Sequence, residues 1–532
     1  NSKLADFEFN KSIIIENIQR LSEKKAELII FPESSLFGYH PFDLLERSVL
    51  VDQQNKALKD ILKSIPQDVH VLIGGFEKNE NRKGRPYFNT AFLCRKNKIV
   101  KTFHKELLPT GDVFDEARFI EKGTLKNNFF KLNGKTFFLT ICEDIWAWEN
   151  KSRTSEYVEN PLKKVKKQKI DLVINMSASP FYVEKLKERE HVVAQTAKHF
   201  KAPVAYVNLV GSQDELIYDG QSFLTDKNGK KIFQMLSFEE DSNVFDINTL
   251  ESWHSRLKKE TATEQLHKAL VLGLRDYAKK TGHHKVHLGL SGGIDSAVVA
   301  ALAVDAFGPQ NVVLFALPTQ FNVAESFQFA QKMAKNIGCS LKEISIQSTF
   351  EHIKNIFDVA FDIKDFTVVH ENMQSRIRGM YLMAYSNLTG SLLLTTGNKS
   401  EYATGYSTLY GDMCGGLAPI GDLTKKQVYD MARFYNHQSE IIPNFIIDRP
   451  PSAELRPNQK DQDSLPEYDQ LDAAVVRIVE KKQKVKTDID RWLITKLMKT
   501  EFKRWQAPPI LKVSSHSFGR GRRYPISHSA KE

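Results

Sequence analysis

Cysteine is scarce in this chain, and its scarcity excludes a disulfide-bonded scaffold. Only four cysteines occur among 532 residues, with no CxxC pair and no zinc-site spacing: Cys94, Cys142, Cys339 and Cys414. This usage is typical of a reducing compartment, so we predict a cytoplasmic protein. The chain also lacks any run of about 18 apolar residues, the length that a membrane-spanning helix needs. We therefore expect no membrane partner.

A surplus of acidic residues is absent as well, which leaves the chain basic. Lysine and arginine number 75 against 65 aspartates and glutamates, and the formal net charge is +10 with a pI near 9.0. Such a balance suits either a nucleic-acid partner or phosphorylated substrates. With 41% hydrophobic and 26% charged residues, the composition is that of an ordinary globular protein too long for one core. We predict two large domains.

A glycine-rich turn in the second half carries the strongest chemical signal. Ser291 to Ser296 reads Ser-Gly-Gly-Ile-Asp-Ser and stands between apolar segments 286–290 and 297–304, a pattern typical of strand, turn and buried helix. Its backbone N–H groups and serine hydroxyls can converge on an anion at the helix start. The turn lacks the lysine of a P-loop but carries Asp295, an acid suited to hold magnesium against phosphates. The alternative is an ordinary serine-capped turn.

This turn resembles the pyrophosphate-binding loop of the ATP pyrophosphatases. The resemblance implies an enzyme that adenylates a substrate and releases pyrophosphate. It indicates a reaction type and leaves the substrate open.

Three polar residues stand at the ends of apolar strands in the first half, where alternating strands and helices predict a layered α/β domain. They are Glu33, Lys105 and Cys142. A thiolate nucleophile needs a base to take its proton and a cation to stabilise the oxyanion formed on attack. Glu33 can supply the first and Lys105 the second. Taken alone, Cys142 would instead be a small buried apolar residue.

The segments around these residues resemble the nitrilase, or carbon–nitrogen hydrolase, superfamily. The resemblance covers roughly residues 1 to 250 and rests on three motifs in order: Phe31-Pro32-Glu33, Lys105 with Leu108-Pro109 and Phe114-Asp115-Glu116, and Cys142-Glu143-Asp144-Ile145-Trp146. It implies a nitrilase-like αββα sandwich. It also implies Glu33 as general base, Lys105 as oxyanion stabiliser and Cys142 as the nucleophile that forms a thioester with an amide substrate.

The same resemblance implies a glutamine-binding segment and shows two departures. By similarity to glutamine-using relatives, the segment after the strand 171–175 would contact glutamine through Ser179 and Lys185, whereas the alternative is a simple turn. Where such relatives commonly place a tyrosine after Leu-Pro, this chain has Gly111. The first core strand of the fold would precede Asn1, so we expect that strand to be missing from this sequence.

Five segments of the second half carry a further resemblance: Glu371 to Met380, Thr396 to Glu401, Tyr410-Gly411-Asp412, Gly421 to Lys425 and Gln506-Ala507-Pro508-Pro509. On these segments, the second half closely resembles the bacterial NAD synthetases from about residue 263 to 525. We place the domains at 1–247 and 264–532, with a polar linker at 248–263 and a basic tail at the C-terminus. Alternating strands and helices predict a Rossmann-like parallel sheet in the second domain.

This resemblance implies the residues of a second site. Deamido-NAD would contact Asn372, Glu401 and Lys503, and magnesium would bind Asp295 and Glu401. ATP would be held by the following residues: Gly289, Leu290, Ser291, Gly292, Gly293, Ile294, Asp295, Ser296, Thr396 and Lys425.

Two further predictions concern the surroundings of that site. Apolar spacing predicts a helix over 372–387 with four residues inward: Met373, Ile377, Met380 and Ala384. The polar, proline-rich segment 451–457 is either a mobile lid or a plain connecting loop.

Together the resemblances predict a magnesium-dependent amidating enzyme with glutamine, ATP and deamido-NAD as substrates, forming a homodimer or larger homo-oligomer without nucleic acid. Alternatives are another glutamine-fed ATP pyrophosphatase such as a GMP or asparagine synthetase, a tRNA-modifying adenylating protein and an inactive scaffold. The nitrilase-like half argues against the first. The lack of paired cysteines beside the loop argues against the second, and the presence of the expected site residues argues against the third.

Overall fold

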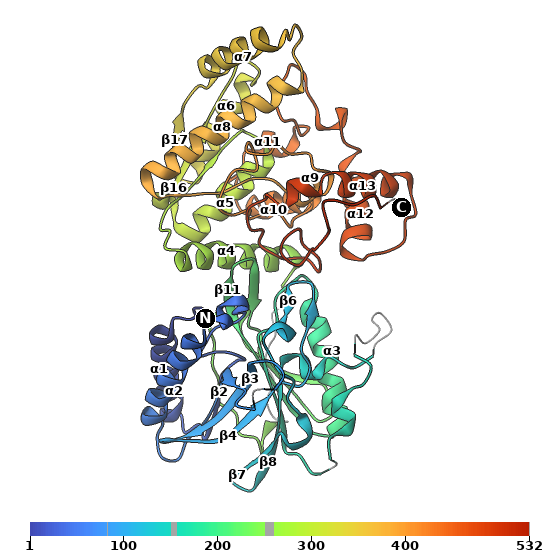
Figure 1. Cartoon of the computed structure of the whole chain (residues 1–532). Coiled ribbons are helices and arrows are strands. Elements are labelled where there is room, and N and C mark those ends of the chain that lie inside the picture. Colours follow the sequence, from blue (N-terminus) through green and yellow to red (C-terminus); the bar gives the residue numbers. More distant parts are fainter. Residues whose placement is uncertain (82, 150–156, 167, 251–259, 531–532) are drawn as a thin grey trace. The chain divides into compact units, whose positions relative to one another are not determined.

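The chain divides into two compact units (Figure 1). One comprises Asn1–Gln213 with Ile217–Lys259, and the other comprises Asp214–Leu216 with Glu260–Glu532. The structure is a computed structural model that describes residues 1–530 except 82, 150–156, 167 and 251–259. Most of the expected linker therefore lies outside the described residues. Within the part of the chain that is described, no helix is both long and apolar enough to cross a membrane.

Two β-sheets form the centre of the first unit. One has the order β1-β2-β3-β4, with bounds Leu28–Ile30, His70–Lys78, Tyr87–Arg95 and Lys98–His104. The other has the order β14-β13-β10-β9-β8-β7, with bounds Lys231–Gln234, Phe223–Thr225, Val204–Asn208, Leu172–Ser177, Lys135–Ile141 and Phe129–Leu132. Two short pairs complete the strands: β5 (Thr110–Gly111) with β6 (Phe114–Asp115), and β11 (Val210–Gln213) with β12 (Leu216–Asp219).

The two sheets pack face to face, and helices cover their outer faces, so the first unit has four layers. Leu72 of β2 and Ile174 of β9 belong to one apolar cluster between the sheets. Their chain neighbours face outwards: Ile73 packs with α1 and α2, and Val173 packs with α3. Since successive side chains on a strand point to opposite faces, each sheet buries both of its faces. The predicted αββα sandwich is confirmed. The helices span Phe7–Glu23 (α1), Ser48–Ser64 (α2) and Lys185–Phe200 (α3).

A cavity of about 980 Å³ lies in the first unit beside β1. β1 pairs in parallel with β2, and no strand among the described residues pairs with its other edge. Leu28, Ile30 and Ala205 are among the residues that line the cavity. The space adjoins the edge at which a further strand would extend this sheet. The missing first strand stays a prediction.

A parallel four-stranded sheet organises the second unit. Its order is β17-β16-β15-β18, with bounds Ser340–Glu343, Val312–Ala316, Val286–Gly289 and Leu392–Leu393. On one face, His287 of β15 packs edge-on against Tyr385 of helix α8 (Val368–Thr389). Its neighbours Val286 and Leu288 point to the opposite face and are fully buried. A parallel sheet covered on both faces is the Rossmann-like arrangement that the sequence predicts.

The longest helix of this unit, α8, begins earlier than predicted. Its first residue is Val368, because the Thr367 side chain caps the helix start. Met373 and Ile377 are buried as predicted. The prediction for Met380 was wrong, since its side chain is 55% exposed. Ala384 is exposed as well, because the inward stripe continues through other residues: Tyr381, Leu382 and Tyr385.

The helices of the second unit surround this sheet and the segments that follow it. They are α4 (Ala262–Lys280), α5 (Ile294–Phe307), α6 (Ala324–Asn336), α7 (Gln347–Phe361), α8 (Val368–Thr389), α9 (Lys399–Thr404), α10 (Lys425–Tyr435), α11 (Asn444–Asp448), α12 (Tyr468–Val475), α13 (Asp488–Lys499) and α14 (Glu501–Arg504).

Candidate active sites

The first candidate site is built around an ammonium group shared by two carboxylates. Lys105, which follows β4, is fully buried, and its Nζ donates to Oε1 of Glu33 at 2.9 Å and to Oε1 of Glu116 at 2.8 Å. Burial alone would lower the pKa of Lys105, but the carboxylates of Glu116 and Glu33 raise it well above its usual range. Lys105 is therefore a permanent cation at neutral pH.

The loop after β1 holds Glu33 against the sheet. A glycine makes room for this loop, because a Cβ at Gly74 of β2 would lie 2.2 Å from the backbone nitrogen of Ser34. Glu33 accepts hydrogen bonds from the Ala178 N–H at 2.8 Å and from Asn89 Nδ2 at 2.8 Å. Its carboxylate is thus fixed before any substrate binds.

Cys142 begins a short 3-10 helix, Cys142–Ile145, directly after β8. Its φ of 41° lies in the left-handed region, which is strained for a residue with a Cβ and is concentrated at functional sites. Burial and then the charge of Glu33 raise the pKa of the thiol well above its usual range, while Lys105 and the Ala178 N–H act in the opposite direction. The resting group is therefore a neutral thiol beside an acid and a cation. The three residues predicted from strand ends come together here.

Two members of this cluster had no role in the sequence-based prediction. Glu116 accepts the Tyr39 hydroxyl at 2.6 Å with the same oxygen that meets Lys105. Burial opposes the charge on Glu116, but Lys105 outweighs it and lowers the pKa of that carboxyl. The only signal for Glu116 in the sequence was its place in the Phe-Asp-Glu motif, and nothing there indicated Tyr39.

A third buried acid, Asp144, connects the backbone segments that carry Lys105 and Cys142. Asp144 Oδ1 accepts the N–H groups of Glu106 at 2.9 Å and Leu107 at 3.0 Å, and its Oδ2 accepts that of Ile141 at 2.8 Å. Burial raises the pKa of Asp144 to about 7, although these donors oppose the shift.

The predicted glutamine ligands lie in the same unit. Ser179 is buried, and its hydroxyl accepts Nε of Arg189 at 3.1 Å. Arg189 in turn forms a fully buried pair with Asp219 at 2.7 Å. Lys185 begins α3, and its Nζ lies 3.9 Å from the ring centre of Trp146, in the segment that starts with the candidate nucleophile. Both residues therefore have fixed surroundings close to elements of the first site.

The second candidate site starts at the turn between β15 and α5. The hydroxyl oxygens of Ser291 and Ser296 lie 3.2 Å apart, and Gly293 donates its N–H to Ser291 Oγ at 3.2 Å. Gly292 has a φ of 79°, and a Cβ there would lie 2.6 Å from the carbonyl oxygen of Ser326. Conformation and space both require glycine at this position. The turn leads directly into the first, unpaired N–H groups of α5.

An acid–lysine cluster adjoins this turn. Lys425 Nζ lies 2.5 Å from Asp295 Oδ2 and 3.7 Å from Glu401 Oε1. Asn398 donates from Nδ2 to Asp295 Oδ1 at 2.8 Å. Burial and then the charge of Asp295 raise the pKa of Glu401 well above its usual range. Burial would lower the pKa of Lys425, but Asp295 and Glu401 raise it. One cation therefore serves two acids that the sequence predicted as neighbours.

A third acid extends this cluster and was missed from the sequence. Asp461 accepts the Tyr468 hydroxyl at 2.8 Å, and the Tyr468 ring centre lies 5.1 Å from Lys425 Nζ. Burial raises the pKa of Asp461. No strand end or motif marks this residue. Within the described residues, no group of three or more His, Cys, Asp or Glu side chains is arranged to hold a metal ion by itself.

The predicted deamido-NAD ligands Asn372 and Lys503 converge on one loop. Asn372 Oδ1 accepts the Thr408 hydroxyl at 2.8 Å. Lys503 donates from Nζ to the carbonyl oxygens of Gly405 at 2.8 Å and Ser407 at 2.7 Å. This loop directly follows α9, the helix that carries the second acid of the cluster. The two residues are thereby connected, through α9, to the acid–lysine cluster beside the turn 291–296.

The other predicted ATP ligands lie at neighbouring strand ends. Gly289 is the last residue of β15, Leu290 follows it, and Thr396 lies shortly after β18, the strand beside β15. Leu290 is buried and donates its N–H to Phe315 at 2.8 Å, so only its carbonyl group remains for a ligand. Ile294 is also buried, and its contribution is limited to the backbone.

The proposed lid segment contacts the phosphate turn through a shared neighbour. Glu454 accepts the Ser326 hydroxyl at 2.7 Å and Asn322 Nδ2 at 3.0 Å. Ser326 is also the residue that a Cβ on Gly292 would meet. The segment 451–457 contains no helix or strand, and its mobility stays a prediction.

Comparison with protein families matches both units of the chain. The carbon-nitrogen hydrolase family matches residues 1–254, and the NAD synthase family matches residues 266–507.

Relatives of the whole chain share both parts. The glutamine-dependent NAD(+) synthetase of Synechocystis sp. is 40% identical over 98% of this chain and 96% of the relative. The solved structure of the glutamine-dependent NAD+ synthetase from Acinetobacter baumannii, in complex with ADP, is 32% identical with a TM-score of 0.78 over 99% of this chain and 97% of that chain. The corresponding structure from Cytophaga hutchinsonii has a TM-score of 0.82 at 20% identity, over 99% and 96%, and supports the fold. The chain therefore belongs to the glutamine-dependent NAD(+) synthetases, which are ligases with a glutaminase domain.

Proposed function

We propose that the chain amidates deamido-NAD to NAD through an adenylated intermediate, with ammonia from glutamine. ATP is consumed, and AMP and pyrophosphate are released. The observation that carries this proposal is the presence, in one polypeptide, of a buried Cys–Glu–Lys cluster and a phosphate turn flanked by acids and a lysine. The family supports the overall reaction, and the residue roles below are part of the proposal.

In the first site, Cys142 attacks the side-chain amide carbon of glutamine. Because the thiol is neutral at rest, a base must take its proton, and Glu33 is the acid held beside it. Lys105 remains charged and stabilises the oxyanion that forms on attack. The proton passes to the departing ammonia, and a thioester remains. Water, activated by Glu33, then releases glutamate.

Glutamine recognition is assigned to Ser179 and Lys185. The Ser179 hydroxyl accepts from Arg189 and so keeps its own proton to donate to a substrate carboxylate. Lys185 offers a positive charge to the same group. Gly111 contributes no side chain, and an ideal Cβ there would meet nothing within 4 Å, so this position leaves open space where similar proteins have a tyrosine.

In the second site, the carboxylate of deamido-NAD attacks the α-phosphorus of ATP and pyrophosphate leaves. The residues 289–296, with Thr396 and Lys425, are assigned to the ATP phosphates. Their N–H groups, hydroxyls and ammonium stabilise the negative charge that develops on the leaving group. Asn372, Glu401 and Lys503 are assigned to deamido-NAD. Ammonia then attacks the mixed anhydride, which forms the amide and releases AMP.

The acids of this site fit a magnesium ion that arrives with ATP. The chemistry of the donor set supports this assignment, because Asp295 and Glu401 are two carboxylates with Lys425 as their shared cation, and burial disfavours the charge on Glu401. Magnesium is commonly held by one or two carboxylates and substrate phosphates, without a full protein cage. The ion would neutralise phosphate charge when bound. Lys425 keeps both acids in place and supplies a second positive charge.

The test separates the two sites by their nitrogen source. Cys142→Ala should abolish glutamine-supported NAD formation and leave ammonia-supported formation within about twofold of the wild type, because the nucleophile is needed only to release ammonia. Pyrophosphate and NAD are measured with deamido-NAD, ATP and either nitrogen source. Loss of both activities in a folded variant would contradict the assignment of Cys142. A wild type that uses another acid in place of deamido-NAD would contradict the proposed substrate.

We further propose that the protein is a homo-oligomer that covers an apolar surface on α7 and α8. Exposed apolar side chains gather on these two packed helices: Ile356, Val359, Phe361 and Val368, with exposed fractions of 59%, 85%, 65% and 63%. Such a surface favours association, and a second copy of this chain is the partner that a homo-oligomeric enzyme provides.

A further inference from the structure

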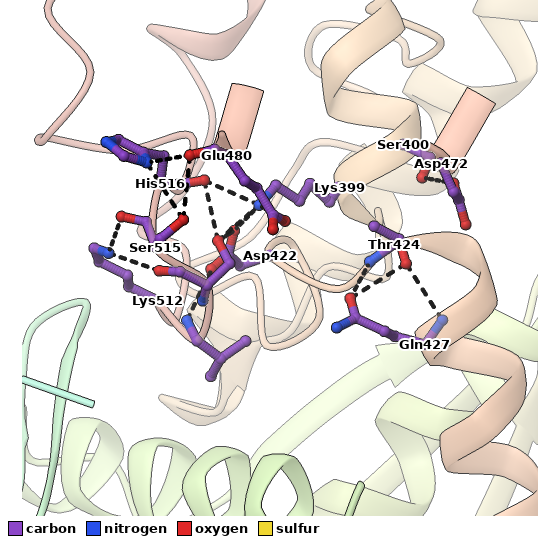
Figure 2. Close-up of polar contacts among 12 residues, drawn as sticks. Lys399, Ser400, Asp422, Thr424, Gln427, Asp472, Glu480, Lys512, Ser515 and His516 are labelled. Atoms are coloured by element: carbon purple, nitrogen blue, oxygen red, sulfur yellow. Dashed lines mark hydrogen bonds and ion pairs between the residues drawn. The ribbon is translucent and has the colours of Figure 1, made fainter. Parts of the chain in front are cut away.

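Lys399 is a fully buried lysine that is not among the proposed binding residues. Lys399 donates from Nζ to Glu480 Oε1 at 2.6 Å, Ser514 Oγ at 2.7 Å and the His516 carbonyl oxygen at 2.9 Å, and it lies 3.0 Å from Asp422 Oδ1 (Figure 2). A buried ammonium group is stable only when its charge is paired and its protons are bonded. Both conditions are met here.

Lys399 is the first residue of α9, and its neighbours point to the phosphate site. Asn398, the N-cap, donates to Asp295 at 2.8 Å and accepts the N–H of Glu401 at 3.0 Å. Glu401 accepts the Asn398 N–H at 3.1 Å in return. The same helical turn therefore presents two side chains to the acid–lysine cluster and one, Lys399, to the buried interior. Any rotation of this turn moves Asn398 and Glu401 together relative to Asp295.

The next residue, Ser400, ties the same turn to the start of α10. Its hydroxyl donates to Asp472 Oδ1, as Figure 2 shows, and accepts the N–H of Lys425 at 3.2 Å. Asp472 Oδ2 accepts the N–H of Lys426 at 2.7 Å. The helix starts that carry the second acid and the cation of the site are thus held by one interior network.

The chain near its C-terminal end completes this network. Asp422 Oδ2 accepts the N–H groups of Val513 at 2.8 Å and Ser514 at 2.7 Å. Ser514 and His516 also accept hydrogen bonds from the Lys399 ammonium, so the segment 513–516 binds both Lys399 and Asp422. These contacts join residues more than 100 positions apart in the sequence. The segment 513–516 therefore fixes the first turn of α9.

We propose that Lys399 is a positioning residue of the synthetase reaction. Its ammonium, held by Asp422, Glu480 and the segment 513–516, sets the orientation of α9 so that Asn398 and Glu401 meet Asp295. The inference rests on the proposed function of this site. It goes beyond that function by assigning the C-terminal segment to the geometry of the phosphate site.

The test compares Lys399→Met with a matched control, Lys512→Met. Lys512 is another buried lysine of the same region and donates to the carbonyl oxygens of Ser514 and Ser515 at 2.7 and 2.9 Å (Figure 2). Both variants lose a buried ammonium, but Lys399→Met removes the anchor of α9 itself, whereas Lys512→Met removes a support of the segment 513–516 and leaves Lys399 in place. Ammonia-supported turnover, the dissociation constant of a non-hydrolysable ATP analogue, glutaminase activity and thermal unfolding are measured on the full chain.

We expect Lys399→Met to lower kcat for ammonia-supported synthesis by about 10- to 100-fold, the loss that follows a misplacement near 1 Å. The ATP analogue should bind at least about threefold more weakly, while glutaminase activity stays unchanged. Lys512→Met should lose thermal stability and lose less kcat than Lys399→Met, because Lys399 still anchors α9. A kcat within twofold for Lys399→Met, or equal losses in both variants, would overturn the proposal.

A second variant separates positioning from folding. Lys399→Met leaves Asp422 buried without its cation, so Lys399→Met combined with Asp422→Asn should recover part of the thermal stability. It should not recover kcat, because α9 still lacks its anchor. Recovery of stability and kcat together would show that Lys399 acts only through stability. If the wild type made no NAD from deamido-NAD and ammonia, the proposed function would fail instead, independently of these variants.

Discussion

Replacing Lys105 by methionine removes the cation that two buried carboxylates share. Glu33 and Glu116 would remain 1% and 3% exposed with no ammonium between them. Breaking a buried ion pair by removing one partner typically costs about 3–5 kcal/mol. For a unit of this size that corresponds to a loss of roughly 10 °C in the unfolding temperature. Glutaminase activity should fall by at least about 100-fold, because the oxyanion loses its stabilising cation.

The stability loss in Lys105→Met should depend on pH. In the wild type, the raised pKa of Lys105 and the lowered pKa of Glu116 make contributions that are complete between pH 5.5 and 8. Without the ammonium, Lys105 no longer opposes the effect of burial on Glu116, and burial raises the pKa of that carboxyl, so the folded state binds a proton that the unfolded state releases. Stability of the variant then falls as pH rises through this window. The deficit relative to the wild type should be larger at pH 8 than at pH 5.5.

Thermal unfolding at the two pH values, together with glutaminase and ammonia-supported synthesis, checks this prediction. Lys101→Met is the matched control, because Lys101 lies on β4, the strand that Lys105 follows, and donates to the carbonyl oxygens of Asn127 and Phe129. Its effect should be small and independent of pH. A deficit in Lys105→Met that is equal at pH 5.5 and 8, or glutaminase activity within tenfold of the wild type, would refute the reasoning.

Three other variants test separate parts of the molecule. Asp295→Ala should abolish synthesis from glutamine and from ammonia while glutaminase persists; retained ammonia-dependent turnover would contradict its role. Asp144→Asn should lower glutaminase at least about tenfold, since an amide NH₂ would face the Ile141 N–H. Burial raises the pKa of Asp144 to about 7, so ionisation of this carboxyl destabilises the folded wild type as pH rises from 4 to 7. The amide of the variant does not ionise, so the free energy of unfolding of the variant should rise relative to that of the wild type over this range, by at most about 4 kcal/mol. Val359→Glu with Phe361→Glu should lower the oligomer mass in analytical ultracentrifugation, and an unchanged mass would exclude this surface.

The first site shows which contacts a sequence can predict. Glu33, Lys105 and Cys142 each follow an apolar strand, and the ends of strands in two packed sheets are limited in number and lie near one another. The strand pattern therefore reduces the number of residues that could lie beside a candidate nucleophile. Tyr39 and Glu116 lie in loops with no periodic pattern. Their contact depends on how two loops fold over the sheets, which no local signal in the sequence specifies.

The second site shows the same division. The phosphate turn could be predicted because its glycines are required locally: Gly292 has a positive φ and no room for a Cβ. The position of Asp461 near Lys425 could not be predicted, because it depends on how a long irregular segment folds. The inward stripe of α8 was followed correctly through Ile377 and then lost at Met380. A helix turns 100° per residue, so a small error in the assumed spacing reaches the wrong face after two turns.

Both sites place a buried lysine between carboxylates. In each site the carboxylates outnumber the lysine, but the additional carboxylate has a different role in the proposed chemistry. At Lys105, two acids surround one cation, so one carboxylate can take the proton of Cys142 without leaving the lysine unpaired. At Lys425, Asp295 and Glu401 share the cation, and Asp461 adds a third nearby acid. Burial and then the charge of Asp295 raise the pKa of Glu401, and Lys425 only partly opposes them. A divalent cation bound with ATP would add to the effect of Lys425, whereas in the first site an added cation would compete with Lys105 for Glu33. The same arrangement of side chains therefore predicts that magnesium stimulates synthesis and has no effect on glutamine hydrolysis.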